Sequence, residues 1–161
     1  MTRNRLDLAT KAGELLGGHQ LLLVTAESCT GGGIAEAVTD VPGSSGWFDW
    51  GFVSYSNDAK QAMLGVSPDT LARDGAVSEA VVLEMARGAI EQSRAHVSVA
   101  VSGVAGPGGG TADKPVGTVW IAWGQKLGYA EASCFHFDGD RIEVRHQTVA
   151  AALEGLIARL Q

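Results

Sequence analysis

The sequence predicts an α/β fold, a three-layer α/β/α sandwich with a mixed, mostly parallel sheet of about five strands. Short apolar runs without polar alternation, at residues 21–24 and 97–101, are typical of strands buried on both faces of a sheet. Segments with apolar residues at helical spacing stand between these runs. The resulting order of helices and strands is that of a sheet covered by helices on both faces. We expect the 161 residues to form one domain, 1–161.

The first half of the chain is expected to alternate helices and strands. Each boundary is predicted from a capping residue, a glycine or a proline beside an apolar repeat. The expected elements are a helix at 5–16 ended by a glycine pair, a strand at 21–24, a helix from Ile34 to the turn at 40–46, a strand at 51–55, a helix capped by Ser56 or Asn57 and running through Leu64, and a short helix at 70–73.

The second half is expected to hold a long helix, a central strand, a hairpin and a closing helix. A turn around Gly124 to Gly128 joins the two hairpin strands. The expected elements are a helix from Glu79 to about Arg94 capped by Ser78, a strand at 97–101, hairpin strands at 117–123 and 129–137, and a helix at 141–160.

Composition excludes several classes of protein. Twelve Lys and Arg against eighteen Asp and Glu give a formal charge of -6, and no basic run interleaves with aromatic residues, so we expect no nucleic-acid partner. No apolar run approaches the ~18 residues of a membrane span, and no secretory leader pattern opens the chain. The two cysteines, Cys29 and Cys134, fit a reducing compartment. We therefore expect a cytoplasmic protein without a membrane partner.

Three aromatic residues, Trp47, Phe48 and Trp50, follow the turn at 40–46. Core packing or a subunit interface is the favoured interpretation, and a ring-binding wall beside the turn is the alternative. With Trp47 and Trp50 as exposed aromatic candidates, a homodimer is the expected assembly.

A cluster of functional groups follows the strand at 21–24, where Glu27, Ser28, Cys29 and Thr30 precede three consecutive glycines. The carboxyl end of a strand is where open α/β sheets bind ligands. Each glycine in the first turn of a helix costs about 1 kcal/mol relative to alanine, so helix propensity does not explain them. Close approach of a ligand to bare backbone does, and a turn that merely needs glycine is the alternative. We interpret the cluster as an active site.

The sequence contains no motif for metal binding or for nucleotide hydrolysis. The histidines lack ligand spacing, and there is no Cys-x-x-Cys pair. A Walker loop and a dinucleotide-binding fingerprint are also missing. We therefore expect no metal ion and no cofactor.

The reaction type that these residues still permit is nucleophilic attack on a carbonyl carbon, with Ser28 as the attacking group. The N–H groups from Thr30 to Gly33 would receive the oxyanion. Lys60 follows the next predicted strand and would serve as the base if its amine were neutral, although an exposed lysine is the simpler interpretation. Tyr55 would relay the proton or hold the amine. Cys29 is the rival nucleophile, unless it faces the core as a small hydrophobic residue.

A second glycine-rich loop, at residues 102–111, leaves the end of the central strand at 97–101. It is either part of the same site or a flexible surface excursion. Arg141 and Arg145 lie four residues apart on one face of the closing helix. Their guanidinium groups could grip a phosphate, and the alternative is a solvated surface pair.

Five motifs of the chain closely resemble the carboxy-terminal domain of the competence-damage-inducible CinA family. They occur in the order of that family and span nearly the whole chain. They are Thr-Ala-Glu-Ser-Cys-Thr-Gly-Gly at 25–32, Tyr-Ser-Asn-x-x-Lys at 55–60, Ala-Val-Ser-Gly-Val-Ala-Gly-Pro-Gly-Gly at 100–109, Lys-Pro-x-Gly-Thr-Val at 114–119 and Gly-Asp-Arg at 139–141.

The resemblance implies an amidohydrolase that converts nicotinamide mononucleotide (NMN) and water to nicotinate mononucleotide and ammonia, in pyridine-nucleotide salvage. It implies that Ser28 is the nucleophile and Lys60 the general base, assisted by Tyr55. The arginines Arg141 and Arg145 would bind the phosphate. The residues expected to receive the oxyanion or hold the nucleotide are Thr30, Gly31, Gly32, Gly33, Ser102, Gly103, Ala105, Gly106, Gly108 and Gly109.

The chain departs from the family pattern in three ways. Gly33 stands where a larger aliphatic residue is usual, and Ser102 stands where threonine is common. The amino-terminal domain of longer members is not found here, so the stand-alone form is expected. A non-catalytic pyridine-nucleotide-binding module is the alternative function, and a phosphatase is a third. The role of Glu27, which could orient Lys60 or shape the turn, stays open.

Overall fold

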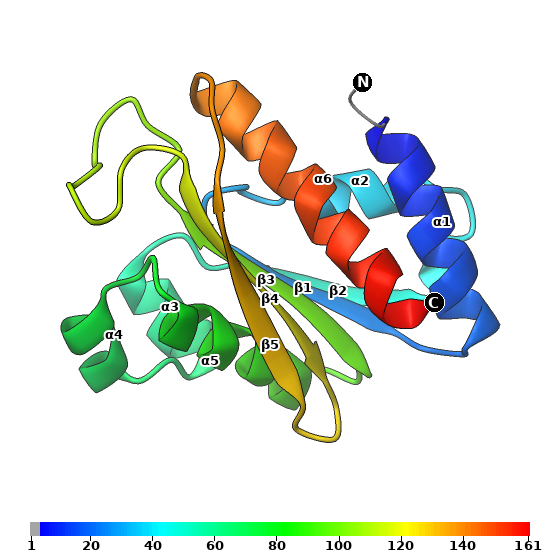
Figure 1. Cartoon of the computed structure of the whole chain (residues 1–161). Coiled ribbons are helices and arrows are strands. Elements are labelled where there is room, and N and C mark those ends of the chain that lie inside the picture. The colour runs from blue at the N-terminus through cyan, green and yellow to red at the C-terminus, as the bar shows by residue number, and fades with distance from the viewer. Residues whose placement is uncertain (1–3) are drawn as a thin grey trace.

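The computed structural model describes residues 4–161, which build one five-stranded sheet with the order β2-β1-β3-β4-β5 (Figure 1). β1 pairs in parallel with β2 and β3, whereas β4 is antiparallel to both β3 and β5. Four strands therefore run in one direction and β4 alone in the other, so the predicted mixed, mostly parallel sheet is confirmed. The strands are β1 (Leu23–Glu27), β2 (Phe48–Val53), β3 (Val97–Gly103), β4 (Thr118–Gln125) and β5 (Ala130–His136).

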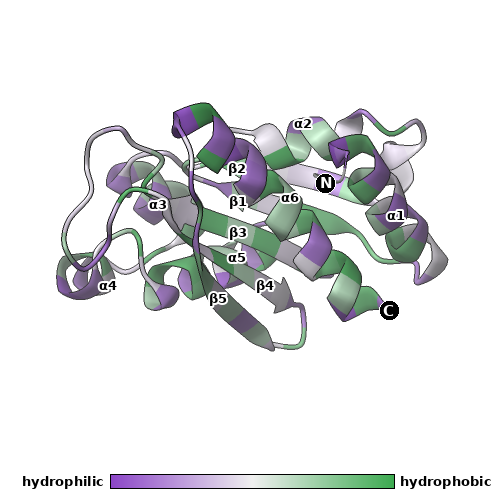
Figure 2. Cartoon of the chain, turned by 45° about the horizontal axis from the view of Figure 1, so that its top comes forward, coloured by the Kyte–Doolittle hydropathy of each residue, from purple (hydrophilic) through white to green (hydrophobic). Residues whose placement is uncertain are grey.

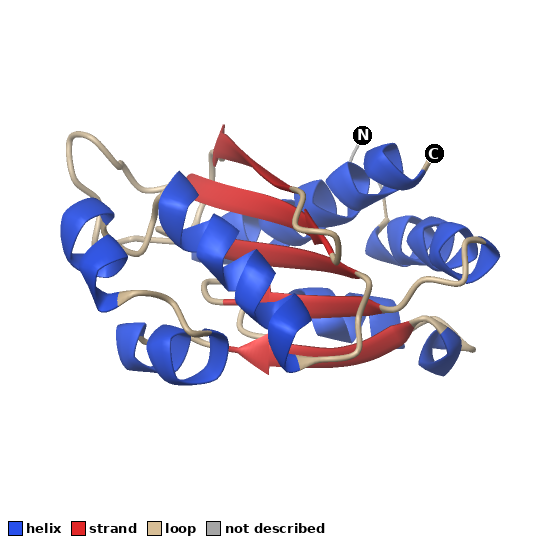
Figure 3. Cartoon of the chain, turned by 90° about the horizontal axis from the view of Figure 1, so that it is seen from below, coloured by secondary structure: helices blue, strands red, loops and turns tan. Residues whose placement is uncertain are grey.

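Helices cover both faces of the sheet, which confirms the three-layer architecture (Figures 1 and 3). One layer consists of α1 (Arg5–Gly18), α2 (Gly33–Thr39) and α6 (Arg141–Leu160). The other consists of α3 (Asn57–Leu64), α4 (Pro68–Asp74) and α5 (Glu79–Gln92). A short 3-10 helix, η1 (Ser44–Gly46), precedes β2. Within residues 4–161, no helix is both long enough and apolar enough to cross a membrane.

Two hydrophobic cores lie on opposite faces of the sheet because successive side chains of a strand point to opposite sides. Leu23 and Val99 pack toward α1 and α6, whereas Val24 and Ala100 pack toward α5. Figure 2 shows β3 as largely hydrophobic along its length, while the outer helices carry both hydrophobic and hydrophilic residues. Burial on both faces explains why the central strands appear in the sequence as unbroken apolar runs.

β2 is the element whose predicted position was wrong. It spans Phe48–Val53, not residues 51–55. The strand begins earlier than predicted because Trp47, the residue before it, packs its ring on α1, where a Cβ at Gly13 would lie 2.4 Å from that ring. Trp47 is only 7% exposed. The prediction that it is an exposed aromatic is therefore wrong, and the prediction that it belongs to the core is confirmed. Trp50, on the edge strand β2, is 46% exposed.

α3 and α5 touch at a glycine. A Cβ added to Gly88 of α5 would lie 1.8 Å from the carbonyl oxygen of Leu64, the last residue of α3. The backbones of the two helices therefore pack in direct contact, which fixes where α3 stands beside the sheet.

Candidate active site

A pocket of about 210 Å³ opens at the carboxyl ends of β1, β2 and β3. The helices that follow β1 and β2 lie on opposite faces of the sheet, which is the arrangement that opens a crevice for ligands. The pocket is lined by Ser28, Cys29, Tyr55, Asn57, Lys60, Ala76, Val77, Ser102, Gly103, Ala105 and Arg141.

The turn that carries Ser28 is held by main-chain hydrogen bonds. The Ser28 N–H donates to the Val101 carbonyl of β3 at 3.1 Å, and the Gly31 N–H donates back to the Ser28 carbonyl at 3.1 Å. Gly31 and Gly32 have φ angles of 59° and 102°, a region that other residues rarely adopt. Two of the three glycines are thus explained by the shape of the turn. The third, Gly33, starts α2, where an added Cβ would lie 3.1 Å from a methyl group of Val149.

Glu27 shapes this turn. Its carboxylate is buried and accepts hydrogen bonds from the Thr30 hydroxyl at 2.5 Å, the Ile34 N–H at 2.8 Å and the Ala35 N–H at 3.0 Å. These donors belong to the turn and to the start of α2, and Lys60 is not among its partners. Of the two roles left open by the sequence, the structure therefore supports a structural one.

Replacing Glu27 with glutamine is expected to lower the free energy of unfolding by about 1–3 kcal/mol, because the amide NH₂ would face N–H donors and leave one of them unsatisfied. Chemical denaturation with urea measures the change. Glu36→Gln, at an exposed position of α2, the helix whose first N–H groups donate to Glu27, is the matched control and should leave the unfolding midpoint within error. Equal midpoints for the two variants would contradict the structural role of Glu27.

Lys60 is the most unusual residue of the pocket because its side chain is only 1% exposed. α3 begins at Asn57 under the Ser56 cap, whose hydroxyl accepts from the Ala59 N–H at 3.0 Å, and this start turns Lys60 inward. Nζ lies 2.9 Å from the Ser28 Oγ. Burial lowers the pKa of the Lys60 amine below its ordinary value, so the neutral form gains population.

Two further oxygens surround the Lys60 amine, the carbonyls of Tyr55 at 2.9 Å and Ser54 at 3.2 Å. A neutral amine has two N–H donors and one lone pair. When both N–H groups donate to these carbonyls, the lone pair is left for the Ser28 hydroxyl, which is the orientation that proton abstraction needs. The Ser28 Oγ also lies 3.3 Å from the Tyr55 carbonyl, so its proton has two acceptors within reach.

Tyr55 contacts Lys60 through its main chain and not through its phenol. The ring is 59% exposed, and its hydroxyl accepts from Nη2 of Arg141 at 3.2 Å. Nη1 of Arg141 donates to the Gly106 carbonyl at 2.8 Å. The phenol thus lies with Arg141 at the mouth of the pocket, away from the amine it was expected to hold.

The two arginines of α6 are directed to different places. Arg141 lines the pocket, whereas Arg145 donates to the carbonyls of Cys29 at 3.0 Å and Thr30 at 3.1 Å. The predicted residues of the glycine-rich loops also separate. Ser102, Gly103 and Ala105 line the pocket, and those outside its lining are Thr30, Gly31, Gly32, Gly33, Gly106, Gly108 and Gly109.

Cys29 is packed into the hydrophobic core on the α6 side of the sheet and is 6% exposed. Burial raises the pKa of its thiol to about 11, so the thiol stays protonated at neutral pH. A protonated thiol is a weak nucleophile, which favours Ser28 over this rival.

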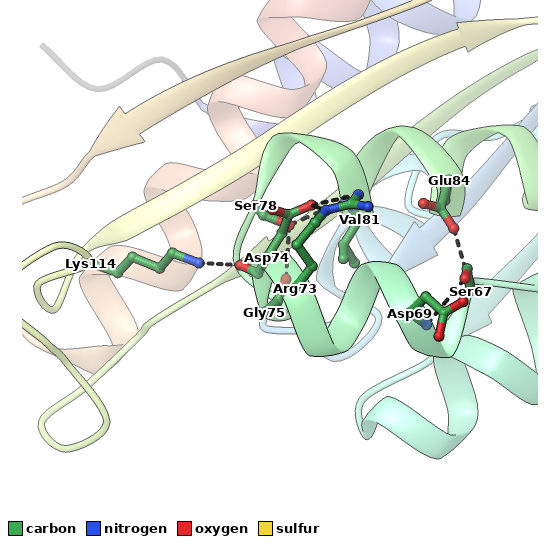
Figure 4. A network of polar contacts seen from close by, with 9 residues as sticks. All are labelled: Ser67, Asp69, Arg73, Asp74, Gly75, Ser78, Val81, Glu84 and Lys114. Atoms are coloured by element: carbon green, nitrogen blue, oxygen red, sulfur yellow. Dashed lines mark hydrogen bonds and ion pairs between the residues drawn. The ribbon is translucent and has the colours of Figure 1, made fainter.

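Four groups of the site were missed in the sequence: three residues of the pocket lining, and the Ser54 carbonyl, which accepts from Lys60 without lining the pocket. Asn57 stands inside the Tyr-Ser-Asn-x-x-Lys motif, which is a usable signal, whereas Ser54, Ala76 and Val77 give none. The last two lie in the connection between α4 and α5. Lys114, which follows the second glycine-rich loop, donates to the carbonyl of Asp74, the last residue of α4, at 2.6 Å (Figure 4). This hydrogen bond links the segment after the loop to the start of the connection.

The chain is similar to known proteins in both sequence and structure. The family model of the CinA C-terminal domain matches residues 5–160. The nicotinamide-nucleotide amidohydrolase PncC of Pseudomonas putida is 56% identical over 151 residues, covering 93% of this chain and 93% of that protein. PncC of Escherichia coli is 50% identical over 151 residues, covering 94% and 92%. The crystal structure of the competence/damage inducible protein CihA from Agrobacterium tumefaciens has a TM-score of 0.95 and 47% identity, covering 100% of this chain and 99% of that one. The chain described here therefore belongs to the CinA C-terminal domain family.

Proposed function

We propose that this protein hydrolyses the carboxamide of NMN to give nicotinate mononucleotide and ammonia, with Ser28 as nucleophile and Lys60 as general base. The observation that carries the proposal is the 2.9 Å contact between the Lys60 amine and the Ser28 hydroxyl at the bottom of a pocket. Neither residue of this buried pair is needed merely to bind a nucleotide. The PncC relatives, named for amide hydrolysis of nicotinamide nucleotides, supply the substrate class.

In the proposed reaction the neutral Lys60 amine takes the Ser28 proton while Oγ attacks the carboxamide carbon. The tetrahedral intermediate collapses, the C–N bond breaks, and the Lys60 ammonium returns its proton to the leaving nitrogen, so that ammonia departs. The nicotinoyl group is then an ester of Ser28. Water attacks this ester, again deprotonated by Lys60, and the carboxylate product leaves with Ser28 restored.

The developing oxyanion needs N–H donors that are not already used. Within residues 4–161, the N–H groups of Gly31 and Gly33 donate to carbonyls of the turn, whereas those of Cys29, Thr30 and Gly32 donate to no main-chain carbonyl. We assign the oxyanion to the N–H groups of Cys29 and Thr30, the two that directly follow Ser28, in place of the wider range from Thr30 to Gly33 expected at first.

Electrostatics support an anionic substrate. The lining of the pocket contains the cationic Arg141 and no carboxylate, and Lys60 is neutral in the proposed reaction, although the whole chain carries a formal charge of -6. Arg141 lies beside the Tyr55 hydroxyl at the mouth of the pocket, where the phosphate of a mononucleotide would lie when its carboxamide reaches Ser28.

The test is an ammonia-release assay with NMN, NAD, nicotinamide riboside and nicotinamide, combined with calorimetric titration of NMN. We expect turnover with NMN above all the others. Saturable NMN binding without ammonia release would support the alternative, a non-catalytic pyridine-nucleotide-binding module, and would refute amide hydrolysis.

A homodimer and a cytoplasmic location remain predictions. Trp50 and Val53, which are 46% and 49% exposed on the edge strand β2, are the apolar residues that a second copy would cover.

A further inference from the structure

The guanidinium of Arg145 lies against the main chain of the Ser28 turn and not in the pocket. We propose that Arg145 is a positioning residue: it orients the Cys29–Thr30 peptide so that the Thr30 N–H is available to the oxyanion. This assignment replaces the phosphate-binding role expected from the sequence, and it rests on the proposed amide hydrolysis.

The direction of the Thr30 N–H follows from the geometry of the peptide unit. In a trans peptide the C=O and N–H groups point in opposite directions, and this peptide is trans. The Cys29 carbonyl points to Nε of Arg145 at 3.0 Å, so the Thr30 N–H points away from α6. The next N–H, that of Gly31, donates to the Ser28 carbonyl at 3.1 Å. The Gly31 N–H thus stabilises the turn, and the Thr30 N–H, oriented by Arg145, is left for the oxyanion.

Thr30 is held from two sides. Its hydroxyl donates to Glu27 at 2.5 Å, and its carbonyl accepts from Nη2 of Arg145 at 3.1 Å. An added Cβ at Gly31 would lie only 3.3 Å from the same Nη2, so the guanidinium packs directly against bare backbone. The charged donor on the Cys29 carbonyl also polarises the Cys29–Thr30 peptide and strengthens the Thr30 N–H as a donor.

The same contacts argue against a phosphate role for Arg145. Nε and Nη2 form one of the guanidinium edges that bind an oxyanion with two parallel hydrogen bonds. In Arg145 this edge is occupied by the Cys29 and Thr30 carbonyls. Arg141 also donates from Nη1 to Gly106 and from Nη2 to the Tyr55 hydroxyl, but its Nε makes no hydrogen bond within the described residues. Because Arg141 lines the pocket and is exposed, it is the arginine placed for a phosphate.

The experiment compares Arg145→Ala and Arg145→Lys with Arg141→Ala. We expect Arg145→Ala to lower kcat for ammonia release from NMN by about 10²-fold, the loss seen when one oxyanion donor is removed. Arg145→Lys should recover part of this loss, because an ammonium can reach one carbonyl but cannot span two. Arg141→Ala should instead raise KM.

Binding without turnover separates the two roles of an arginine. In a Ser28→Ala background, the calorimetric Kd for NMN should change less than about 3-fold on adding Arg145→Ala and should rise by about tenfold or more on adding Arg141→Ala. Equal weakening of NMN binding by both changes, with kcat retained in Arg145→Ala, would overturn the proposal in favour of a phosphate ligand.

Hydrogen exchange keeps this inference distinct from the proposed function. If the unmodified protein releases no ammonia, the function fails while the orientation of the turn is still measurable. Amide exchange of residues 28–35, followed by mass spectrometry, should become faster in Arg145→Lys and stay unchanged in Arg141→Ala. Unchanged exchange in both would refute the positioning role whatever the activity.

Discussion

Replacing Ser28 with alanine is expected to reduce kcat for ammonia release from NMN by at least about 10³-fold. Among the described residues, this hydroxyl is the only one hydrogen-bonded to the Lys60 amine, whose other partners are carbonyl oxygens that cannot form an ester with the substrate. Loss of the hydroxyl leaves Lys60 with its two carbonyl acceptors, so the fold and NMN binding should persist. A coupled ammonia assay and calorimetry measure the two effects.

Cys29→Ala is the matched control, since it removes the rival nucleophile beside Ser28. Its buried, protonated thiol predicts a kcat within about 3-fold of the unmodified protein. Rapid inactivation by iodoacetamide, together with an inactive Cys29→Ala variant, would assign the nucleophile to the thiol and reject the role of Ser28.

Replacing Lys60 is expected to give the second largest effect. Lys60→Met retains the volume but not the base, and kcat should fall by about 10²–10⁴-fold. Lys60→Arg separates basicity from charge, because a guanidinium is not deprotonated in proteins and should fail equally. Lys11→Met, at an exposed position on α1, is the control and should keep full activity. Activity in Lys60→Arg would contradict a general-base mechanism.

The pH dependence has a defined sign. Because burial lowers the Lys60 pKa, kcat/KM should rise as pH rises through that lowered value, below the 10.5 of an ordinary lysine. Stability follows the same direction. Between the folded pKa and 10.5 the unfolded chain binds a proton that the folded chain does not, so the free energy of unfolding rises with pH in this window. Thermal melts of Lys60→Met should lack this rise.

The elements with strong periodicity or caps were the ones that could be predicted. The closing helix is predicted at 141–160, as observed, because a turn with the cap residue Asp140 precedes a regular apolar repeat, and the structure adds a capping box between Asp140 and Glu143. β2 was misplaced because Phe48 and Trp50 resemble core or interface aromatics, and only the packing of Trp47 against Gly13 reveals where the strand begins.

The residues of the site also divide into those that could be predicted from the sequence and those that could not. Ser28 and Lys60 could be proposed from motif and residue chemistry, and the fold brings them together. The contacts of Tyr55, Glu27 and Arg145 could not be predicted, since each involves main-chain atoms. A carbonyl or an N–H is common to every residue type, so only the tertiary structure reveals which ones face a side chain.

The contact at Gly88 gives the chemistry a remote dependence. α3 carries the proposed base, Lys60, and the turn after β1 carries the proposed nucleophile, Ser28, so the distance between them is set by packing. The spacing depends on how deeply α3 lies beside the sheet, and the Leu64 carbonyl rests where any side chain at position 88 would be. A methyl group there would clash with this carbonyl, and we expect it to displace the last turn of α3 and to increase the distance between the Lys60 Nζ and the Ser28 Oγ. The absence of a side chain at position 88 therefore helps to set the distance over which the proposed proton transfer takes place, although Gly88 does not line the pocket.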